Sequence, residues 1–240
     1  MRERLLEWLV CPLCSEELEL EISLQEGQEI IEGTLQCLCG QIFPIIGGIP
    51  RMLHGVLKRN LIRVYPEFFQ RYPELAEETF VFQSDSIIVQ KQKTVDRFGY
   101  EWTRFDDYDC DNFKAFINPL PVNFLKGKLG LDIGCGAGRH ARQASERGAE
   151  MVCIDLSEAV DIAYKNNAGN DLIHVVQGDI YNLPFKRDNF QFIYSLGVLH
   201  HLPEPERGYQ ALIPLLSEGG VLFIWLYAYA PRKVALEILR

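Results

Sequence analysis

The segment Leu131–Arg139 constrains the fold of this chain more than any other part of its 240 residues. It reads Leu-Asp-Ile-Gly-Cys-Gly-Ala-Gly-Arg, so an apolar run enters three glycines at alternate positions, and a helical pattern follows. Glycines at such a point let the backbone turn sharply and let a ligand approach the main chain. The strand, the glycine turn and the helix start therefore occur in the order that a nucleotide-binding unit requires.

Alternating strands and helices continue from this segment towards the C-terminus. We expect strands over 129–133, 151–156, 173–176, 190–195 and 221–227, with helices over 139–147, from an N-cap at Ser157 to 167, and over 204–216. Buried strands that alternate with helices are typical of a parallel, doubly wound sheet. The sequence therefore predicts an α/β, Rossmann-like domain over residues 119–240.

Acidic residues end the first three of these strands. Asp132 lies two residues before the first glycine, and Asp155 lies 23 residues after Asp132. Asp179 belongs to the run Gly178-Asp179-Ile180. A carboxylate at Asp132 would repel a pyrophosphate but suits a cation, and S-adenosylmethionine carries a sulfonium and an ammonium without any phosphate. Asp155 is placed to accept hydrogen bonds from both ribose hydroxyls, and Asp179 from an adenine amino group.

Each of these features also has a plainer interpretation. The glycine segment alone is compatible with a dinucleotide site or with an ordinary strand-to-helix turn. Asp155 alone is compatible with an acid that the helix dipole favours, and Gly178-Asp179 with common turn chemistry. The order of the features along the chain favours the nucleoside site over these alternatives.

Taken together with Ser195–Leu202, which reads Ser-Leu-Gly-Val-Leu-His-His-Leu, these segments resemble the ordered motifs of class I S-adenosylmethionine-dependent methyltransferases. The resemblance covers about residues 115–228 and is to the small-molecule subgroup that includes quinone-biosynthesis methyltransferases. It implies that Asp132 and the glycines contact the methionine part, Asp155 the ribose and Asp179 the adenine. The cofactor-binding residues expected on this basis are Tyr100, Asp132, Gly134, Cys135, Gly136, Gly138, Asp155, Leu156, Gly178, Asp179, Ile180 and Ser195.

Candidate catalytic groups follow from the chemistry of methyl transfer. This reaction is an in-line displacement at a carbon that the sulfonium activates, so the protein mainly aligns the acceptor and excludes water. His200 and His201 follow the fourth strand, and a histidine titrates near neutrality, so either is a candidate base for an oxygen or nitrogen acceptor. Tyr100 and Tyr194 are weaker candidates. In the family a histidine pair at this place is often structural, which is the alternative for both.

The C-terminal end departs from the family pattern. The family's sheet normally continues with two more strands after the fifth, but only 12 residues follow Ala228 here. Pro214 also interrupts the last predicted helix. We therefore expect either a sheet that stops at five strands or a chain truncated at its C-terminus.

The N-terminal residues 1–52, which we call the head, form a separate acidic module. Three basic and nine acidic residues give the head a net charge of −6, and short alternating runs at 18–22 and 30–35 predict two strands with a turn at Glu26-Gly27. A module of this size buries little core and usually needs a metal or disulfides.

Four cysteines in the head supply such a ligand set. Cys11 and Cys14 form a C-x-x-C pair, and after 22 intervening residues Cys37 and Cys39 form a shorter C-x-C-G pair. Four thiolates on two turns predict a structural Zn²⁺ site of the ribbon type, with free thiols or a lost metal as the alternative. The run Phe43–Pro50 is similar to the tail of small zinc-ribbon proteins that partner or precede methyltransferases, which implies a structural or adaptor role and a protein partner.

Between these regions, residues 53–118 are rich in aromatic residues and are broken by Pro66 and Pro73. We expect short helices that form a linker or lid and pack on the C-terminal domain. Within this segment, Phe98–Trp102 is similar to a stretch that some methyltransferases fold over the cofactor, and ordinary lid packing is the alternative. The acidic run Asp106–Asp111 lacks the glycine and the distal glutamate of a calcium loop, so we expect a solvated loop.

Composition narrows the function. A formal net charge of −9 disfavours general affinity for nucleic acid. The apolar stretch Val221–Ala230 is too short to span a membrane, the N-terminus does not resemble a signal peptide, and clustered cysteines favour metal in the cytoplasm over disulfides. The sequence predicts S-adenosylmethionine-dependent methyl transfer to a small-molecule or lipid-like acceptor. The alternatives are an RNA base methyltransferase with a zinc head and a non-catalytic zinc-ribbon adaptor with a cofactor-binding domain.

Overall fold

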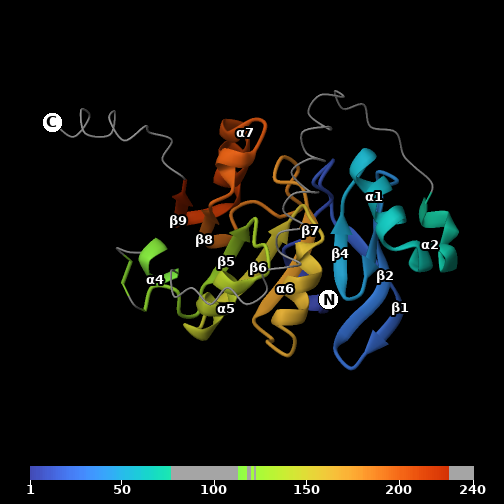
Figure 1. Ribbon diagram of the computed structural model, residues 1–240, viewed down its shortest axis with the longest axis horizontal. Helices are drawn as coiled ribbons and strands as arrows, with labels where there is room; N and C mark the ends of the chain where they lie inside the picture. Colours follow the sequence, from blue (N-terminus) through green and yellow to red (C-terminus); the bar gives the residue numbers. More distant parts are fainter. Residues whose placement is uncertain (77–112, 118–119, 122, 227–240) are drawn as a thin grey trace.

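A single nine-stranded sheet forms the framework of the protein. The structure is a computed structural model that describes residues 1–76, 113–117, 120–121 and 123–226 (Figure 1). The strand order is β1-β2-β3-β4-β7-β6-β5-β8-β9. The strands are β1 (Leu18–Glu26), β2 (Glu29–Cys37), β3 (Ile42–Ile46), β4 (Ile49–Met52), β5 (Leu129–Ile133), β6 (Glu150–Asp155), β7 (Ile173–Gly178), β8 (Phe190–Leu196) and β9 (Leu216–Trp225).

Helices connect and cover these strands. The α-helices are α1 (Val56–Val64), α2 (Pro66–Arg71), α4 (Phe113–Phe116), α5 (Arg139–Glu146), α6 (Ala159–Asn166) and α7 (Pro205–Leu212), and the 3₁₀ turns are η1 (Glu3–Glu7), η2 (Pro73–Ala76), η3 (Leu199–His201) and η4 (Ile213–Leu215). Among the described residues, no helix combines the length and the apolar composition that crossing a membrane requires.

The C-terminal half of the sheet is parallel, as the sequence predicted. β7, β6, β5, β8 and β9 run in the same direction, and every residue of β7 is buried. Helices α5 and α6 pack against β6 and β7. The α/β, Rossmann-like prediction is therefore confirmed, with five parallel strands in this half of the described sheet.

The predicted end of this domain needs a correction. The helix expected over 204–216 stops at Leu212 and continues only as the 3₁₀ turn η4, because Pro214 cannot supply a backbone N–H. β9 begins at Leu216, five residues before the predicted start at Val221, and the expected strand end at Tyr227 lies outside the described residues.

The head is an antiparallel meander of β1, β2 and β3. Paired residues include Leu20 with Leu35, and Leu35 with Phe43, so one row of apolar side chains crosses the three strands. Leu35 and Phe43 are fully buried, whereas β1 forms the outer edge and is mostly exposed. The two predicted strands are thus present, and each is longer than its alternating run.

The short strand β4 joins the head to the parallel strands. β4 pairs antiparallel with β3 on one side and parallel with β7 on the other, where Arg51 faces Gln177 and Met52 faces Gly178. Figure 1 shows the blue and cyan strands of the head beside α6 and β7. One core cluster contains Leu35 and Phe43 of the head together with Leu131 of β5, so the two regions share a hydrophobic interior.

Helices α1 and α2 lie against the head, which differs from the expected packing on the C-terminal domain. Leu57, Leu61 and Phe68 pack in a cluster with Ile46 of β3. Leu156 after β6 packs against this cluster, and the Tyr65 hydroxyl donates to Asp161 of α6, so the helices also contact the parallel half. The expected roles of Phe98–Trp102 and of Asp106–Asp111 fall on residues outside the described ranges.

Candidate functional site

A pocket opens at the C-terminal ends of β5, β6, β7 and β8, beside the point where the strand order reverses. Open α/β sheets bind ligands at this place. The lining residues are Ile133, Gly134, Ile154, Asp155, Leu156, Ser157, Gly178, Asp179, Ile180, Tyr181, Leu196, Gly197, Val198, His201, Leu202 and Pro203. The sequence thus predicted seven of them, Gly134, Asp155, Leu156, Gly178, Asp179, Ile180 and His201.

The glycine loop passes closely between neighbouring elements. Gly134 has a φ of 71°, and a Cβ on it would lie 2.4 Å from the Val198 side chain. The N–H groups of Gly134 and Cys135 both donate to the Ile154 carbonyl, at 2.8 and 3.1 Å. A glycine is therefore required at position 134, and the loop is fastened to the end of β6.

Asp155 ties the glycine loop to the start of α6. Its Oδ2 accepts the Gly136 N–H at 3.0 Å, and its Oδ1 accepts both the Ser157 N–H at 2.9 Å and the Ser157 hydroxyl at 2.7 Å. The Ser157 hydroxyl in turn accepts the Ala159 N–H at 3.3 Å, but the N-cap position of α6 is Glu158, one residue after the predicted Ser157. Asp155 also lines the pocket, where a ribose could reach its carboxylate. Its contact with the ribose remains a prediction.

Asp132 is the buried acid beneath the loop. It is 2% exposed and pairs across the sheet with Tyr194, whose hydroxyl donates to Asp132 Oδ2 at 3.1 Å. Burial raises the pKa of Asp132 to about 8, and the hydrogen bond from Tyr194 opposes this shift. Tyr194 itself is fully buried and its pKa lies well above the usual value, first because of burial, so the structure makes it a partner of Asp132 and not a base.

The third acidic strand end forms a tight turn. Asp179 is 2% exposed, and its Oδ1 accepts the Tyr181 N–H at 3.1 Å. Sequence reasoning missed Tyr181, which lines the pocket and accepts the Glu204 N–H on its hydroxyl at 2.8 Å. The position of Tyr181, two residues after an acidic strand end, is the signal that could have found it.

The two histidines have different positions. His201 lines the pocket, whereas His200 does not, and their ring centroids are 4.0 Å apart. Burial lowers the pKa of His200. The other predicted residues that do not line the pocket are Asp132, Cys135, Gly136, Gly138 and Ser195, and Tyr100 lies outside the described residues.

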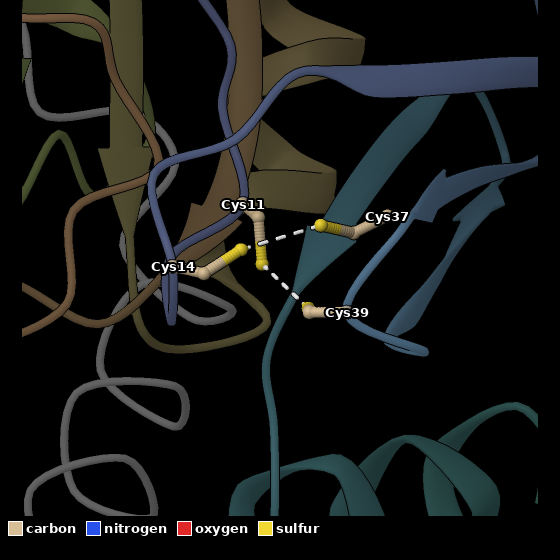
Figure 2. A group of neighbouring side chains, drawn as sticks. All are labelled: Cys11, Cys14, Cys37 and Cys39. Atoms are coloured by element: carbon tan, nitrogen blue, oxygen red, sulfur yellow. Dashed lines mark hydrogen bonds between the residues drawn. The ribbon is translucent and has the colours of Figure 1, made fainter.

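The four cysteines of the head converge on one point, as Figure 2 shows. Their Sγ atoms all lie within 4.8 Å of one another, with 3.7 Å between Cys11 and Cys39 and 3.4 Å between Cys14 and Cys37. Zinc–sulfur bonds of about 2.3 Å in a tetrahedron place sulfurs about 3.8 Å apart. The donor set and its spacing therefore fit Zn²⁺.

The short C-x-C spacing does not prevent this convergence. Cys37 ends β2, and the Gly40 N–H donates to the Cys37 carbonyl at 2.9 Å, which turns the chain back towards Cys37. Gly40 has a φ of 88°, a left-handed conformation that other residues rarely adopt. In a C-x-x-C pair the second intervening residue helps the chain to turn. Here Gly40, directly after the C-x-C pair, provides the turn.

The fold and the acidic strand ends are typical of Rossmann-like methyltransferases. Residues 131–224 match the family model described as methyltransferase domain, and residues 2–48 match the model described as Trm112p-like protein. The chain therefore combines a segment that matches a methyltransferase domain with a Trm112p-like segment near its N-terminus. Both resemblances predicted from the sequence are confirmed.

Individual relatives are similar over somewhat less than half of the chain. A ubiquinone biosynthesis O-methyltransferase of Coxiella burnetii is 31% identical over 115 residues, 45% of this chain and 49% of that protein. A demethylmenaquinone methyltransferase of Clavibacter sepedonicus is 29% identical and covers 45% of this chain and 44% of that one. The solved S-adenosylmethionine-dependent methyltransferase of Mesorhizobium loti is 28% identical, with a TM-score of 0.40 over 45% of this chain and 49% of that one. The chain spans about half the length of these relatives.

Proposed function

We propose that this protein binds S-adenosylmethionine in the pocket at the strand ends and transfers its methyl group to a small-molecule or lipid-like acceptor. The observation that carries the proposal is the lining of the pocket within a matched methyltransferase domain. Asp155 and Asp179 line it, Asp132 lies beneath the loop, and among the described lining residues none is Lys or Arg.

The charge of the pocket fits this cofactor and not a dinucleotide. A pyrophosphate is bound by basic side chains or by the open N–H groups of a glycine loop. Here the N–H groups of Gly134, Cys135 and Gly136 are already donated to Ile154 and Asp155. Carboxylates and a loop with few open donors favour a positively charged nucleoside without phosphate.

The chain's own residues position the reactants. When bound, S-adenosylmethionine supplies a methyl group that is already activated for displacement. Asp155 holds the glycine loop against the pocket, and the apolar residues Ile133, Ile154 and Val198 exclude water from it. His201, on the pocket wall, or its neighbour His200 would take the proton of an oxygen or nitrogen acceptor.

The class of acceptor is the second part of the proposal. The Coxiella and Clavibacter relatives are named for the biosynthesis of ubiquinone and for demethylmenaquinone, which supports a quinone-like or other small aromatic or lipid-like acceptor. Neither an RNA acceptor nor a purely adaptor role has better support. We place the reaction in the cytoplasm, on the grounds of the clustered cysteines.

The head has a structural role in this proposal. Cys11, Cys14, Cys37 and Cys39 would hold Zn²⁺, which would fix the two turns of the meander. Leu13 and Leu38, beside these cysteines, are exposed by 38% and 98%, and a protein partner of the head would contact them.

Calorimetry on the purified chain tests the function. We expect S-adenosylmethionine to bind with one-to-one stoichiometry and reduced nicotinamide dinucleotide to give no heat. Incubation with labelled cofactor and a panel of hydroxylated quinones should then label one class of acceptor. Binding of the dinucleotide in place of S-adenosylmethionine would refute the proposal.

A further inference from the structure

Arg51 is a fully buried cation at the junction between the head and the methyltransferase domain. It lies on β4, and its side chain is 0% exposed. Its Nη2 donates to Asp161 Oδ1 of α6 at 2.6 Å and to the Ile46 carbonyl at 3.2 Å, and its guanidinium carbon lies 4.6 Å from the Tyr65 ring centroid. The other Asp161 oxygen accepts the Tyr65 hydroxyl. A buried charge with these partners is held in one orientation.

The remaining contact of Arg51 leads towards the cofactor pocket. Its Nη1 donates to Gln177 Oε1 at 3.1 Å, and Gln177 Nε2 donates to the Leu156 carbonyl at 3.0 Å. Gln177 is 2% exposed and stands in register between Arg51 on β4 and Asp155 on β6. One row across three strands therefore connects the head with the residue pair Asp155-Leu156, both of which line the pocket.

The order of donors and acceptors along this row is fixed by the chemistry of Arg51. A guanidinium has only donors, so the amide oxygen of Gln177 must face it. The amide nitrogen then has to face the opposite way, where the Leu156 carbonyl accepts it. Without Arg51 the amide could turn over, and two oxygens would then oppose each other at Leu156.

We propose that Arg51 is a positioning residue for cofactor binding: through Gln177 it orients the Leu156 peptide, and so the pocket wall that follows Asp155. The inference rests on the proposed function, because it concerns the affinity of the same pocket. It gives the head a defined effect on the cofactor site, through a single row of side chains.

Gln177→Glu is the variant that isolates this row. A glutamate keeps the size of the side chain and an ion pair with Arg51, but it offers no donor to the Leu156 carbonyl. Loss of one such hydrogen bond should raise the Kd for S-adenosylmethionine about 3- to 10-fold, measured by calorimetry on the full chain. Arg51→Met should raise the Kd by a similar factor. The double variant should have a Kd no higher than that of either single variant, because all of them break the same row.

Asp171→Asn is the matched control. It breaks another ion pair between the head and the domain, Arg2 with Asp171 at 2.7 Å, and Asp171 does not line the pocket. We expect an unchanged Kd in this variant. Hydrogen exchange without cofactor provides a second measurement, because the Ser157 amide should exchange faster in Gln177→Glu than in the parent and in the control.

Three results separate the inference from the proposed function. A raised Kd in folded Gln177→Glu, together with faster Ser157 exchange, supports the inference. Folded variants that melt at lower temperature but bind S-adenosylmethionine with the parent's Kd overturn it and leave the proposed function standing. A parent chain that does not bind S-adenosylmethionine overturns both. If Arg51→Met does not fold, Gln177→Glu alone decides.

Discussion

The head and the parallel domain lie in one sheet but are stabilised in different ways. β7 is buried along its whole length, whereas six of the nine residues of β1 are exposed in a continuous run at its end. The domain therefore depends mainly on burial of apolar surface on both faces of its strands. The head, with one open edge, depends on its four thiols and on the core that it shares with the domain.

The two candidate sites differ in the same way, because one is built from local segments and the other from distant ones. The cysteine site is built from two local turns, each encoded within a few residues. The pocket proposed to bind the cofactor is assembled from four strand ends that lie far apart in the sequence. Changes in the head should therefore act first on metal and stability, and changes in the domain first on ligand affinity.

Removal of the metal ligands should give the largest effect. In Cys11→Ser with Cys14→Ser, two of four donors are lost, so we expect no bound zinc and a loss of several kcal/mol in the free energy of unfolding. Elemental analysis and thermal melting measure both quantities. Leu38→Ser, at a fully exposed position between Cys37 and Cys39, should keep the metal. A parent chain without metal would contradict the zinc proposal.

The next effect concerns the acidic residue that lines the pocket and holds the glycine loop. Asp155→Ala removes three hydrogen bonds to Gly136 and Ser157 and the proposed contacts to ribose, so the Kd for S-adenosylmethionine should rise about 10- to 100-fold. Asp155→Asn keeps one acceptor oxygen, so its affinity for S-adenosylmethionine should fall less than that of the alanine variant. Calorimetry that shows the parent's affinity in the alanine variant would refute the ribose role.

A pH dependence should distinguish the buried acid Asp132 from the other carboxylates. Its pKa in the folded protein is about 8, against an ordinary value of 3.8, so the free protein holds a proton that the unfolded chain has released. Stability should therefore fall as the pH rises from about 4 to about 8. A cation binds the ionised form, so affinity for S-adenosylmethionine should rise about fivefold between pH 7 and 8.

Asp132→Asn supplies the control for this prediction. The amide does not titrate, so the variant should lose both slopes while Tyr194 keeps an oxygen to donate to. Melting temperatures and calorimetry across this pH range measure the two slopes. Slopes that persist in the asparagine variant would show that another group titrates.

The smallest effect on cofactor affinity is expected for the histidines. His200 and His201 are proposed to act on the acceptor and not on the cofactor, so His200→Ala and His201→Ala should change the Kd for S-adenosylmethionine by less than about twofold. Turnover with the true acceptor should fall in one of the two variants if that residue is the base. Full turnover in both variants would exclude the histidines from proton transfer.

The sequence predicted more of the domain than of the junction. The glycine loop, the acidic strand ends and the cysteine pairs are local patterns, and each occurs in the structure at the predicted residues. The short strand β4 has no pattern of its own, and its role comes from pairing with β7, which lies more than 120 residues later. The contacts of Arg51 were missed for the same reason, because Asp161 and Gln177 are distant from it in sequence.

The amino-acid order by itself determined the fold class, the four cysteines that converge in the head and the acidic residues at the strand ends, since these follow from turn geometry and charge within short segments. Tertiary structure alone decided that the head and the domain share one sheet and one core. Strand pairing and side-chain burial depend on which surfaces meet in space, and a local pattern specifies the face of a strand but not its partner.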